Sequence, residues 1–290
     1  MSVETDVPAR IRAIALPTRG GEMAGLEFGP QDRPVDVVFA HANGFNARTY
    51  SAVLAPLTDL RILAVDLRGY GLSDLPARTE DLMSWAGLAD DHLALLAALD
   101  LTDVVLAGHS MGGAISLMAA AQAPGRVRAL ALFDPVVLSR AMVAESGQAP
   151  GDLAAGASRR RSTFPSRAAA FEAYKGRGAF RTWPDEMLAD YVADGFRDLD
   201  DGSVELTCAP AWEAAAFKAS GNDALAAFYA SRCPIAVFRA EKASTAWIDD
   251  EIESLAATGR ITVQSVPGTT HFLPMERPDV VQAALRAAAR

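Results

Sequence analysis

The sequence has very little cysteine: only Cys208 and Cys233 occur in 290 residues. Two cysteines cannot build a disulfide framework, and neither shows the spacing of a metal-ligand motif. We therefore expect no disulfide and no metal site, and interpret both residues as buried apolar side chains. A chain of this length buries enough apolar surface to fold without such cross-links.

Basic residues and long apolar runs are also scarce. Lys and Arg number 27 against 36 Asp and Glu, which gives a net charge of −9. This balance argues against a nucleic-acid-binding surface, and we interpret the one basic run, Arg159–Arg161, as a solvated helix face. The chain has no run of about 18 apolar residues, and its first residues lack the apolar core of a secretory signal. We therefore expect no membrane partner and a cytoplasmic location.

Half of the residues are hydrophobic, and short apolar runs alternate with helical patterns. The runs that predict strands cover residues 35–40, 62–65, 104–107, 127–133, 235–240 and 261–266. Helical spacing of apolar residues marks segments 85–99, 113–121 and 277–289, and an antiparallel hairpin is expected over 10–16 and 22–28. Short buried strands that alternate with helices predict a mostly parallel sheet with helices on both faces.

This alternation stops between residues 138 and 232, where no clear strand pattern appears. The stretch holds 11 of the 21 aromatic residues and has a helical pattern interrupted by Gly and Pro. We predict a helical cap domain over residues 138–232, inserted into a core domain formed by residues 1–137 and 233–290. Most of its aromatic side chains are expected to pack inside the cap, and a minority to line a pocket.

The segment Gly108–Gly113 reads Gly-His-Ser-Met-Gly-Gly and directly follows a predicted strand. A strand, a sharp turn and a helix with the pattern Gly-x-Ser-x-Gly form the nucleophile elbow of acyl-transfer enzymes. Side chains at positions 108 and 112 would collide with neighbouring backbone in such a turn. We therefore predict Ser110 as the nucleophile and the N–H of Met111 as an oxyanion-hole donor.

A serine nucleophile needs a base, and the chain has four histidines. His109 is adjacent to Ser110 on the elbow, so its side chain should point away. His92 lies within a predicted helix, where we expect a solvated or capping role. His271 follows the strand 261–266 through a short loop, and catalytic groups gather at such strand ends. His271 is therefore our predicted general base.

The loop that begins at His41 follows another strand end. A loop in this place can present a second backbone N–H to the oxyanion, opposite that of Met111. We favour the Asn43 N–H for this role, with the Ala42 N–H as the alternative. The imidazole of His41 is expected to brace the loop rather than to accept the proton.

Two carboxylates compete for the role of the acid that orients His271. Asp134 ends the strand 127–133, next to the elbow in chain order, whereas Glu241 directly follows the strand 235–240. Lys242 follows Glu241, as expected for a surface charge. We favour Asp134, which also keeps the order of serine, acid and histidine along the chain.

Four segments together resemble the α/β-hydrolase fold family: 41–45, 66–73, 108–113 and 270–274. The resemblance implies a hydrolase with a mostly parallel sheet, a cap insertion and no cofactor. Two positions differ from the common pattern, because Ala42 replaces the usual glycine and Ala243 stands where the acid usually falls. Members similar to the lactone-cleaving zearalenone hydrolase place the acid after the earlier strand, which matches Asp134.

These features predict a serine hydrolase that cleaves a small-molecule carboxylic ester or lactone through an acyl-enzyme on Ser110. Hydrolysis of a carbon–carbon bond next to a carbonyl would use the same three residues and is the enzymatic alternative. A ligand-binding receptor with residual hydrolysis is the alternative of another class, since scaffolds are reused in this way. Haloalkane and epoxide chemistry is disfavoured, because those enzymes use a carboxylate where this chain has Ser110.

Overall fold

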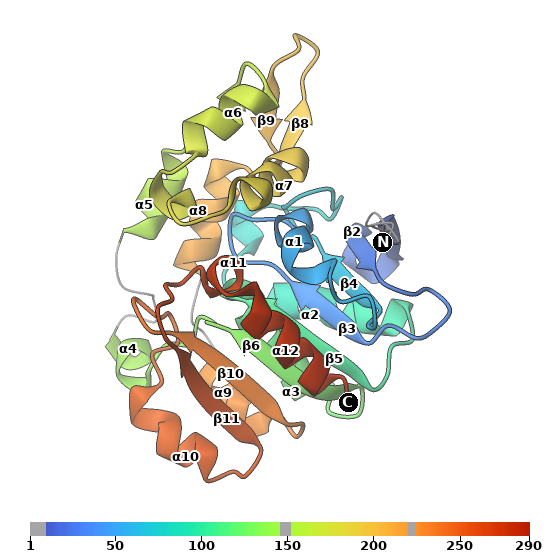
Figure 1. The fold of residues 1–290 in the computed structure, drawn as a ribbon, viewed down its shortest axis with the longest axis vertical. Coiled ribbons are helices and arrows are strands. Elements are labelled where there is room, and N and C mark those ends of the chain that lie inside the picture. The colour runs from blue at the N-terminus through green and yellow to red at the C-terminus, as the bar shows by residue number, and fades with distance from the viewer. Residues whose placement is uncertain (1–9, 146–151, 220–223) are drawn as a thin grey trace, which may run out of the picture.

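An eight-stranded sheet forms the centre of the computed structural model, which describes residues 10–145, 152–219 and 224–290 (Figure 1). Its strand order is β1-β2-β4-β3-β5-β6-β10-β11. The strands are β1 (Arg10–Leu16), β2 (Gly21–Phe28), β3 (Val37–Ala40), β4 (Ile62–Val65), β5 (Val104–His109), β6 (Val127–Phe133), β10 (Ile235–Ala240) and β11 (Ile261–Val266). β2 pairs antiparallel with β1 and β4, and all other neighbours are parallel. The predicted mostly parallel sheet with its opening hairpin is confirmed.

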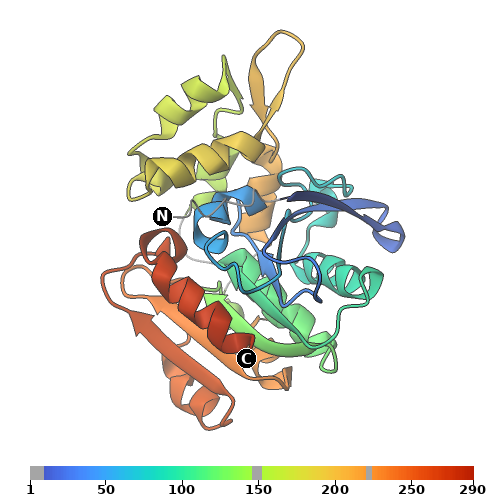
Figure 2. The same ribbon diagram turned by 45° about the vertical axis from the view of Figure 1, so that its right-hand side comes forward.

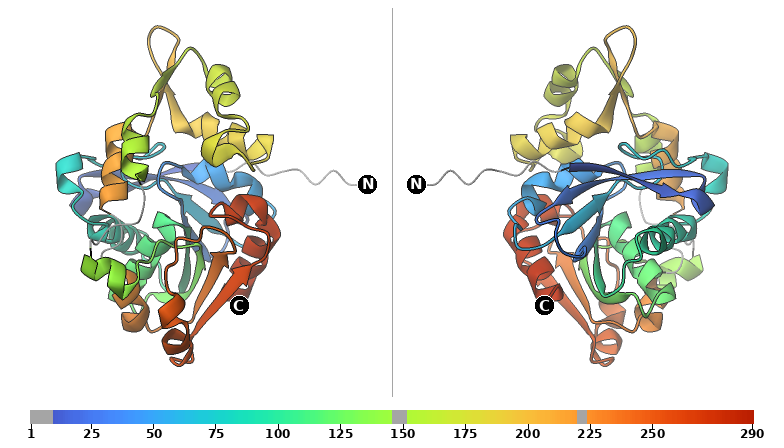
Figure 3. Two further views of the ribbon diagram at one scale, coloured as in Figure 1. Left: turned by 90° about the vertical axis from the view of Figure 1, so that its left-hand side faces the viewer. Right: turned by 90° about the vertical axis from the view of Figure 1, so that its right-hand side faces the viewer.

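The strands are apolar on both faces because helices cover both sides of the sheet (Figure 3). Within β3, Val38 packs into one hydrophobic cluster, and its neighbours Val37 and Phe39 pack into the other. The helices of the core are α1 (Ser51–Leu54), α2 (Ala86–Ala98), α3 (Met111–Gln122), α9 (Ala224–Ala230), α10 (Ile252–Ala256), α11 (Leu273–Glu276) and α12 (Pro278–Ala288). Four 3-10 turns join these elements: η1 (Pro17–Arg19), η2 (Ala47–Tyr50), η3 (Thr79–Asp81) and η5 (Asp249–Glu251). Alternate side chains of each central strand therefore serve two different layers.

The stretch after β6 leaves the sheet, and its residues 152–218 lie above the carboxyl ends of the parallel strands (Figures 1 and 2). It contains α4 (Arg140–Glu145), α5 (Leu153–Ser158), β7 (Thr163–Phe164), α6 (Arg167–Tyr174), η4 (Gly178–Phe180), α7 (Asp185–Gly195), β8 (Phe196–Asp198), β9 (Val204–Leu206) and α8 (Pro210–Lys218). β7, β9 and β8 form a small antiparallel sheet. The expectation that this stretch has no strand is therefore wrong, because strands of two or three residues are too short to show an alternating pattern.

Contacts of the two helices that flank the cap favour narrower limits than the predicted 138–232. Helix α9 packs against α3, and its Leu225 and Phe228 belong to a hydrophobic cluster of the core. Arg140 of α4 forms an ion pair with Glu251, also in the core. We therefore propose that the cap spans residues 152–218. No helix within the described ranges is long and apolar enough to cross a membrane.

Candidate active site

Ser110 lies in the sharp turn between β5 and α3, with φ of 56° and ψ of −120°. Such backbone is strained for a residue with a side chain and is a recurrent feature of functional sites. A Cβ atom at Gly112 would lie 2.3 Å from the carbonyl oxygen of Ala40, and one at Gly108 would lie 2.5 Å from the Gly112 backbone. The predicted need for glycine at both positions is confirmed.

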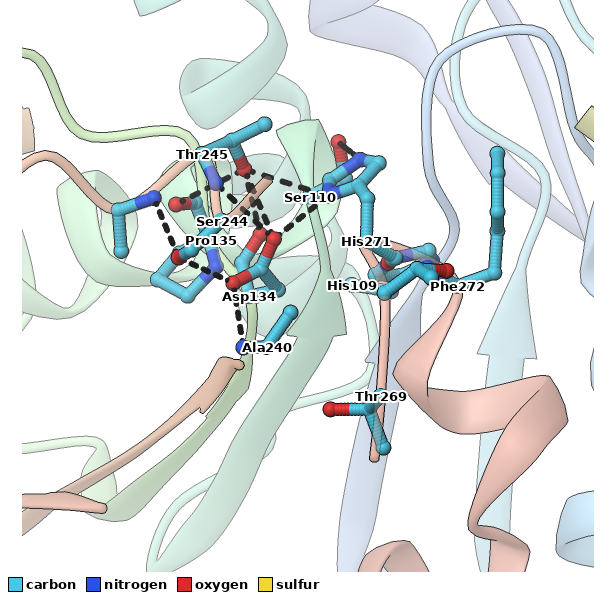
Figure 4. Close-up of polar contacts among 12 residues, drawn as sticks. His109, Ser110, Asp134, Pro135, Ala240, Ser244, Thr245, Thr269, His271 and Phe272 are labelled. Atoms are coloured by element: carbon cyan, nitrogen blue, oxygen red, sulfur yellow. Dashed lines mark hydrogen bonds and ion pairs between the residues drawn. The ribbon is translucent and has the colours of Figure 1, made fainter. Parts of the chain in front are cut away.

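The structure brings Ser110, His271 and Asp134 together at the carboxyl ends of β5, β11 and β6 (Figure 4). The Nε2 atom of His271 lies 3.0 Å from the Ser110 hydroxyl oxygen. The Nδ1 atom of the same ring lies 2.6 Å from Oδ2 of Asp134. In this arrangement the imidazole can take the proton of the serine hydroxyl, and the carboxylate orients the imidazole.

The Asp134 carboxylate is fully buried and accepts several hydrogen bonds (Figure 4). Its Oδ1 accepts from the N–H of Ala240 at 2.8 Å and from the hydroxyl of Ser244 at 2.5 Å. Its Oδ2 accepts from the N–H of Thr245 at 3.0 Å, besides the contact with His271. Burial alone would raise the pKa of Asp134, but the hydrogen bonds and the charge of His271 hold that pKa below its ordinary value. The group is therefore a carboxylate at neutral pH.

The competing acid Glu241 lies elsewhere. Its Oε2 accepts a hydrogen bond from the N–H of Gly268 at 3.0 Å, on the exposed side of the loop. Ala243 sits in the left-handed region, with φ of 51°, in the turn that delivers Ser244 and Thr245 to the carboxylate of Asp134. The loop that carries the acid in the common family pattern thus supplies two hydrogen-bonding residues here.

The backbone N–H groups of Asn43 and Met111, both near Ser110, have no acceptor within the described part of the chain. Both residues line the same cavity as Ser110. The alternative donor, the N–H of Ala42, is engaged, because it donates to the hydroxyl oxygen of Tyr50 at 3.1 Å. Unpaired N–H groups at a helix start and in a facing loop are the donors that an oxyanion requires.

The side chain of Asn43 is held from two sides. Its Oδ1 accepts from the Tyr70 hydroxyl at 2.6 Å, and its Nδ2 donates to the carbonyl oxygen of Glu213 in α8 at 3.2 Å. These bonds join the loop to the core on one side and to the cap on the other. The backbone of Asn43 is therefore fixed without using its own N–H.

His41 braces its loop, as expected. Its Nε2 accepts from the N–H of Leu67 at 2.9 Å, so its Nδ1 carries the proton and donates to the carbonyl oxygen of Ala42 at 2.7 Å. Burial lowers the pKa of His41 to about 4, and the ring stays neutral. The expectation for His92 is wrong: α2 buries this side chain completely, among Leu88, Leu95 and Leu96, and burial lowers its pKa to about 4.

A cavity of about 610 Å³ opens above Ser110 between the core and the proposed cap. Its apolar lining includes Phe45, Trp85, Met111, Val136, Leu153, Phe180, Phe217, Trp247 and Phe272. Trp183 packs instead against Phe45, Phe180 and Phe272, with its indole almost entirely buried. The cap aromatics thus divide between pocket and packing roles, as predicted.

The wall of the cavity also carries a charged pair. Arg160, just after α5, forms an ion pair with Glu213 of α8 and donates to the hydroxyl of Tyr191 at 2.8 Å. Burial alone would lower the pKa of Arg160, but Tyr191 and Glu213 hold it above its ordinary value. The interpretation of the basic run as a solvated face is therefore wrong for Arg160, because its partners lie far away in the sequence.

Several supporting residues were missed from the sequence. Tyr50 and Tyr70 bind the loop 41–45, which we propose as the oxyanion loop, and Ser244 and Thr245 bind Asp134. Only Ser244 and Thr245 had a usable signal, since they follow Ala243, where the usual acid is replaced. Both cysteines are buried and free, and no group of residues that could hold a metal ion occurs among those described.

Comparison with known proteins gives a consistent family. The model of the alpha/beta hydrolase family matches residues 37–284. A 2-(acetamidomethylene)succinate hydrolase of Mesorhizobium japonicum is 26% identical over 256 residues, which are 86% of each chain. A haloalkane dehalogenase of Mycolicibacterium paratuberculosis is 38% identical over 115 residues, only 39% of this chain and 38% of that protein.

Solved structures agree with the fold over nearly the whole length. The crystal structure of an E-2-(acetamidomethylene)succinate hydrolase superposes with a TM-score of 0.79 at 22% identity and covers 97% of this chain and 98% of its own. A thioesterase domain from the curacin biosynthetic pathway superposes with a TM-score of 0.74 at 16% identity, over 96% and 99% of the two chains. Since the family model matches most of its length, this chain belongs to the alpha/beta hydrolase family.

Proposed function

We propose that the protein is a serine hydrolase that cleaves a carboxylic ester or lactone without a cofactor. One observation carries the proposal: Ser110, His271 and Asp134 form a continuous chain of contacts at 3.0 and 2.6 Å. Asn43 and Met111, whose N–H groups have no acceptor among the described residues, line the same cavity and would complete the set of groups that acyl transfer needs.

The reaction follows from these positions. His271 takes the proton of the Ser110 hydroxyl, and the serine oxygen attacks the substrate carbonyl carbon. The N–H groups of Asn43 and Met111 hold the resulting oxyanion, and the carboxylate of Asp134 stabilises the imidazolium of His271. Collapse breaks the carbon–oxygen bond, and the leaving alkoxide takes the proton from His271. Water then attacks the acyl-enzyme, with His271 again as base, and releases Ser110.

The cavity supports a partly apolar substrate of small to medium size. Its volume of about 610 Å³ lies within the usual range of small-molecule sites, and most of its lining is apolar. The relative from Mesorhizobium japonicum is named after 2-(acetamidomethylene)succinate. This compound has an acetamido group and two carboxylates but no ester. Tests of this chain must therefore include amides.

Carbon–carbon bond hydrolysis is the second candidate, because the same contacts of Ser110, His271 and Asp134 would serve it. Dehalogenation is not favoured, since the hydroxyl of Ser110 occupies the position where those enzymes carry a carboxylate. A receptor with residual hydrolysis would show one burst of product and then stop. Sustained turnover would exclude that class.

Covalent labelling tests the nucleophile directly. We expect a fluorophosphonate probe to add once to the protein, on Ser110, and not at all to the Ser110→Ala variant. Ser116→Ala is the matched control, because this buried serine of α3 donates to the carbonyl oxygen of Ala107 and should not affect labelling. Labelling of the Ser110→Ala variant would refute the assignment.

A substrate panel then tests the bond that is cleaved. Aryl esters, aliphatic esters, lactones, amides and diketones should be compared at equal enzyme concentration. We expect the highest kcat/KM for an ester or a lactone. Turnover of diketones alone would overturn the ester proposal in favour of carbon–carbon bond hydrolysis.

A further inference from the structure

His109 is fully buried one residue before Ser110, and both of its ring nitrogens are hydrogen bonded. Its Nε2 lies 2.7 Å from the carbonyl oxygen of His271, and its Nδ1 lies 2.8 Å from the hydroxyl of Tyr50. The same hydroxyl lies 3.1 Å from the backbone nitrogen of Ala42. Three parts of the chain that lie far apart in the sequence, residues 42–50, His109 and His271, thus meet in one line of hydrogen bonds.

Chemistry fixes the direction of each bond in this line. The N–H of Ala42 can only donate, so the Tyr50 oxygen accepts. The carbonyl oxygen of His271 can only accept, so the Nε2 atom of His109 carries a proton. In the neutral ring the Nδ1 atom then accepts from the Tyr50 O–H. One tautomer of His109 and one rotamer of the Tyr50 hydroxyl satisfy every group.

We infer that Tyr50 and His109 form a one-directional hydrogen-bond relay that positions the oxyanion loop and the backbone of His271 relative to each other. The inference rests on the proposed function, because it assigns both residues a part in that reaction. At one end, the N–H of Ala42 is bound to the buried Tyr50 hydroxyl, whereas the N–H of Asn43, the next residue and one that lines the cavity, has no acceptor among the described residues. At the other end, the backbone that carries the catalytic imidazole is tied to the nucleophile elbow.

Burial makes the relay stable in one protonation state. The rings of Tyr50 and His109 have no exposed surface, and burial lowers the pKa of His109 to about 3. The charge of His271, whose ring centre lies 5.0 Å away, opposes a proton on His109 as well, whereas Asp134 favours one. Protonation would remove the acceptor for the Tyr50 hydroxyl. The ring therefore stays neutral at neutral pH.

Neither Tyr50 nor His109 lines the cavity, so both are positioning residues rather than catalytic residues. Their loss should lower kcat and leave KM nearly unchanged, because the substrate-binding wall is intact. Small displacements of reacting groups cost up to about 100-fold in rate. We expect Tyr50→Phe and His109→Leu each to lower kcat by about 10- to 100-fold.

A double-mutant cycle distinguishes a relay from two separate structural roles. If the groups act as one unit, the Tyr50→Phe/His109→Leu double variant should be as slow as the slower single variant. If the fold losses in kcat of the two single variants multiply in the double variant, the relay is refuted. Ser116→Ala again serves as the control, since it removes a buried hydroxyl outside the relay.

Nitrogen-15 NMR of histidine-labelled enzyme tests the direction of the relay without a substrate and without any variant that must fold. We expect His109 to show a protonated Nε2 and an unprotonated Nδ1 at every pH from about 6 to 9. The opposite tautomer, or a cationic ring, would overturn the proposal. Failure of Ser110 to react with fluorophosphonate would instead refute the proposed function and leave the tautomer unchanged.

Discussion

The role of Asp134 yields the sharpest test of the site. Its Oδ1 accepts from the backbone N–H of Ala240, and its Oδ2 accepts from the backbone N–H of Thr245 and from His271. Asparagine at this position must place its amide NH₂ group at one of these two oxygen sites. A backbone N–H cannot become an acceptor. In either orientation the NH₂ group therefore faces a backbone N–H, and both groups are donors.

Both orientations carry a cost of known size. One buried N–H left without an acceptor costs about 1–3 kcal/mol in the free energy of unfolding. If the NH₂ group faces His271, the ring must accept at Nδ1 and carry its proton on Nε2, where it cannot take the proton of Ser110. Loss of the orienting carboxylate in a comparable triad lowers kcat by about 10⁴-fold. We therefore expect a folded, moderately destabilised Asp134→Asn variant with kcat lowered by about 10⁴-fold.

The loss in kcat is checked by saturation kinetics with an aryl ester. The loss in stability is checked by a thermal melt of the same preparations. Glu241→Gln is the matched control, because it also replaces a carboxylate by an amide. Its carboxylate is bound by the N–H of Gly268, so kcat should change by about twofold at most. The reasoning is refuted if Asp134→Asn keeps more than about a tenth of the wild-type kcat, or if Glu241→Gln is the crippled variant.

Three further predictions concern pH, the elbow and the cap. The pKa values of His41, His92 and His109 are lowered from 6.5 to about 4, 4 and 3, so the unfolded chain binds more protons than the folded one between about pH 4 and 6.5. Stability should therefore fall with falling pH, by about 2 kcal/mol per histidine at pH 5. Asp66 and the half-buried Asp190, with pKa values raised from 3.8 to about 6, oppose this with fewer groups and smaller shifts. An equal free energy of unfolding in urea at pH 5 and at pH 7.5 would contradict the burial of these rings. Gly112→Ala should not fold or should lose several kcal/mol (about 3 or more), because its Cβ would meet the Ala40 oxygen at 2.3 Å, whereas Gly125→Ala has free space and should melt like the wild type. Trp183→Ala should lower stability by about 3–5 kcal/mol with KM unchanged, whereas Phe180→Ala should raise KM for apolar esters, since only Phe180 lines the cavity. A raised KM in the Trp183 variant would contradict this division.

The sheet and its catalytic edge could be predicted because their signals are local. Buried parallel strands such as Val104–His109 form continuous apolar runs, and the residue that ends each run lies at one edge of the sheet. The elbow glycines report a steric requirement that no other residue meets. Together these signals predict that Ser110, His271 and a carboxylate lie together, with Asp134 favoured over Glu241 as the acid.

The features that could not be predicted depend on contacts between distant segments. His92 and Arg160 carry polar groups that normally face solvent, and only the tertiary packing buries His92 and pairs Arg160 with Glu213. Tyr50 is 59 residues away from His109 in sequence, and nothing near either residue announces the pair. The short strands β7, β8 and β9 have the same limitation, since each is defined by its partner rather than by its own pattern.

The two sides of the cavity are held together by different kinds of interaction, and this difference has a consequence for function. On the core side, hydrogen bonds with fixed donors join Ala42, Tyr50, His109, His271 and Asp134, so one wrong donor disturbs the whole edge. On the cap side, most of the lining consists of apolar contacts, which depend on volume more than on direction. For the proposed reaction, we therefore expect substitutions in the cap to change the preferred substrate while the reacting groups stay in place, and substitutions at the strand ends to change the reaction itself.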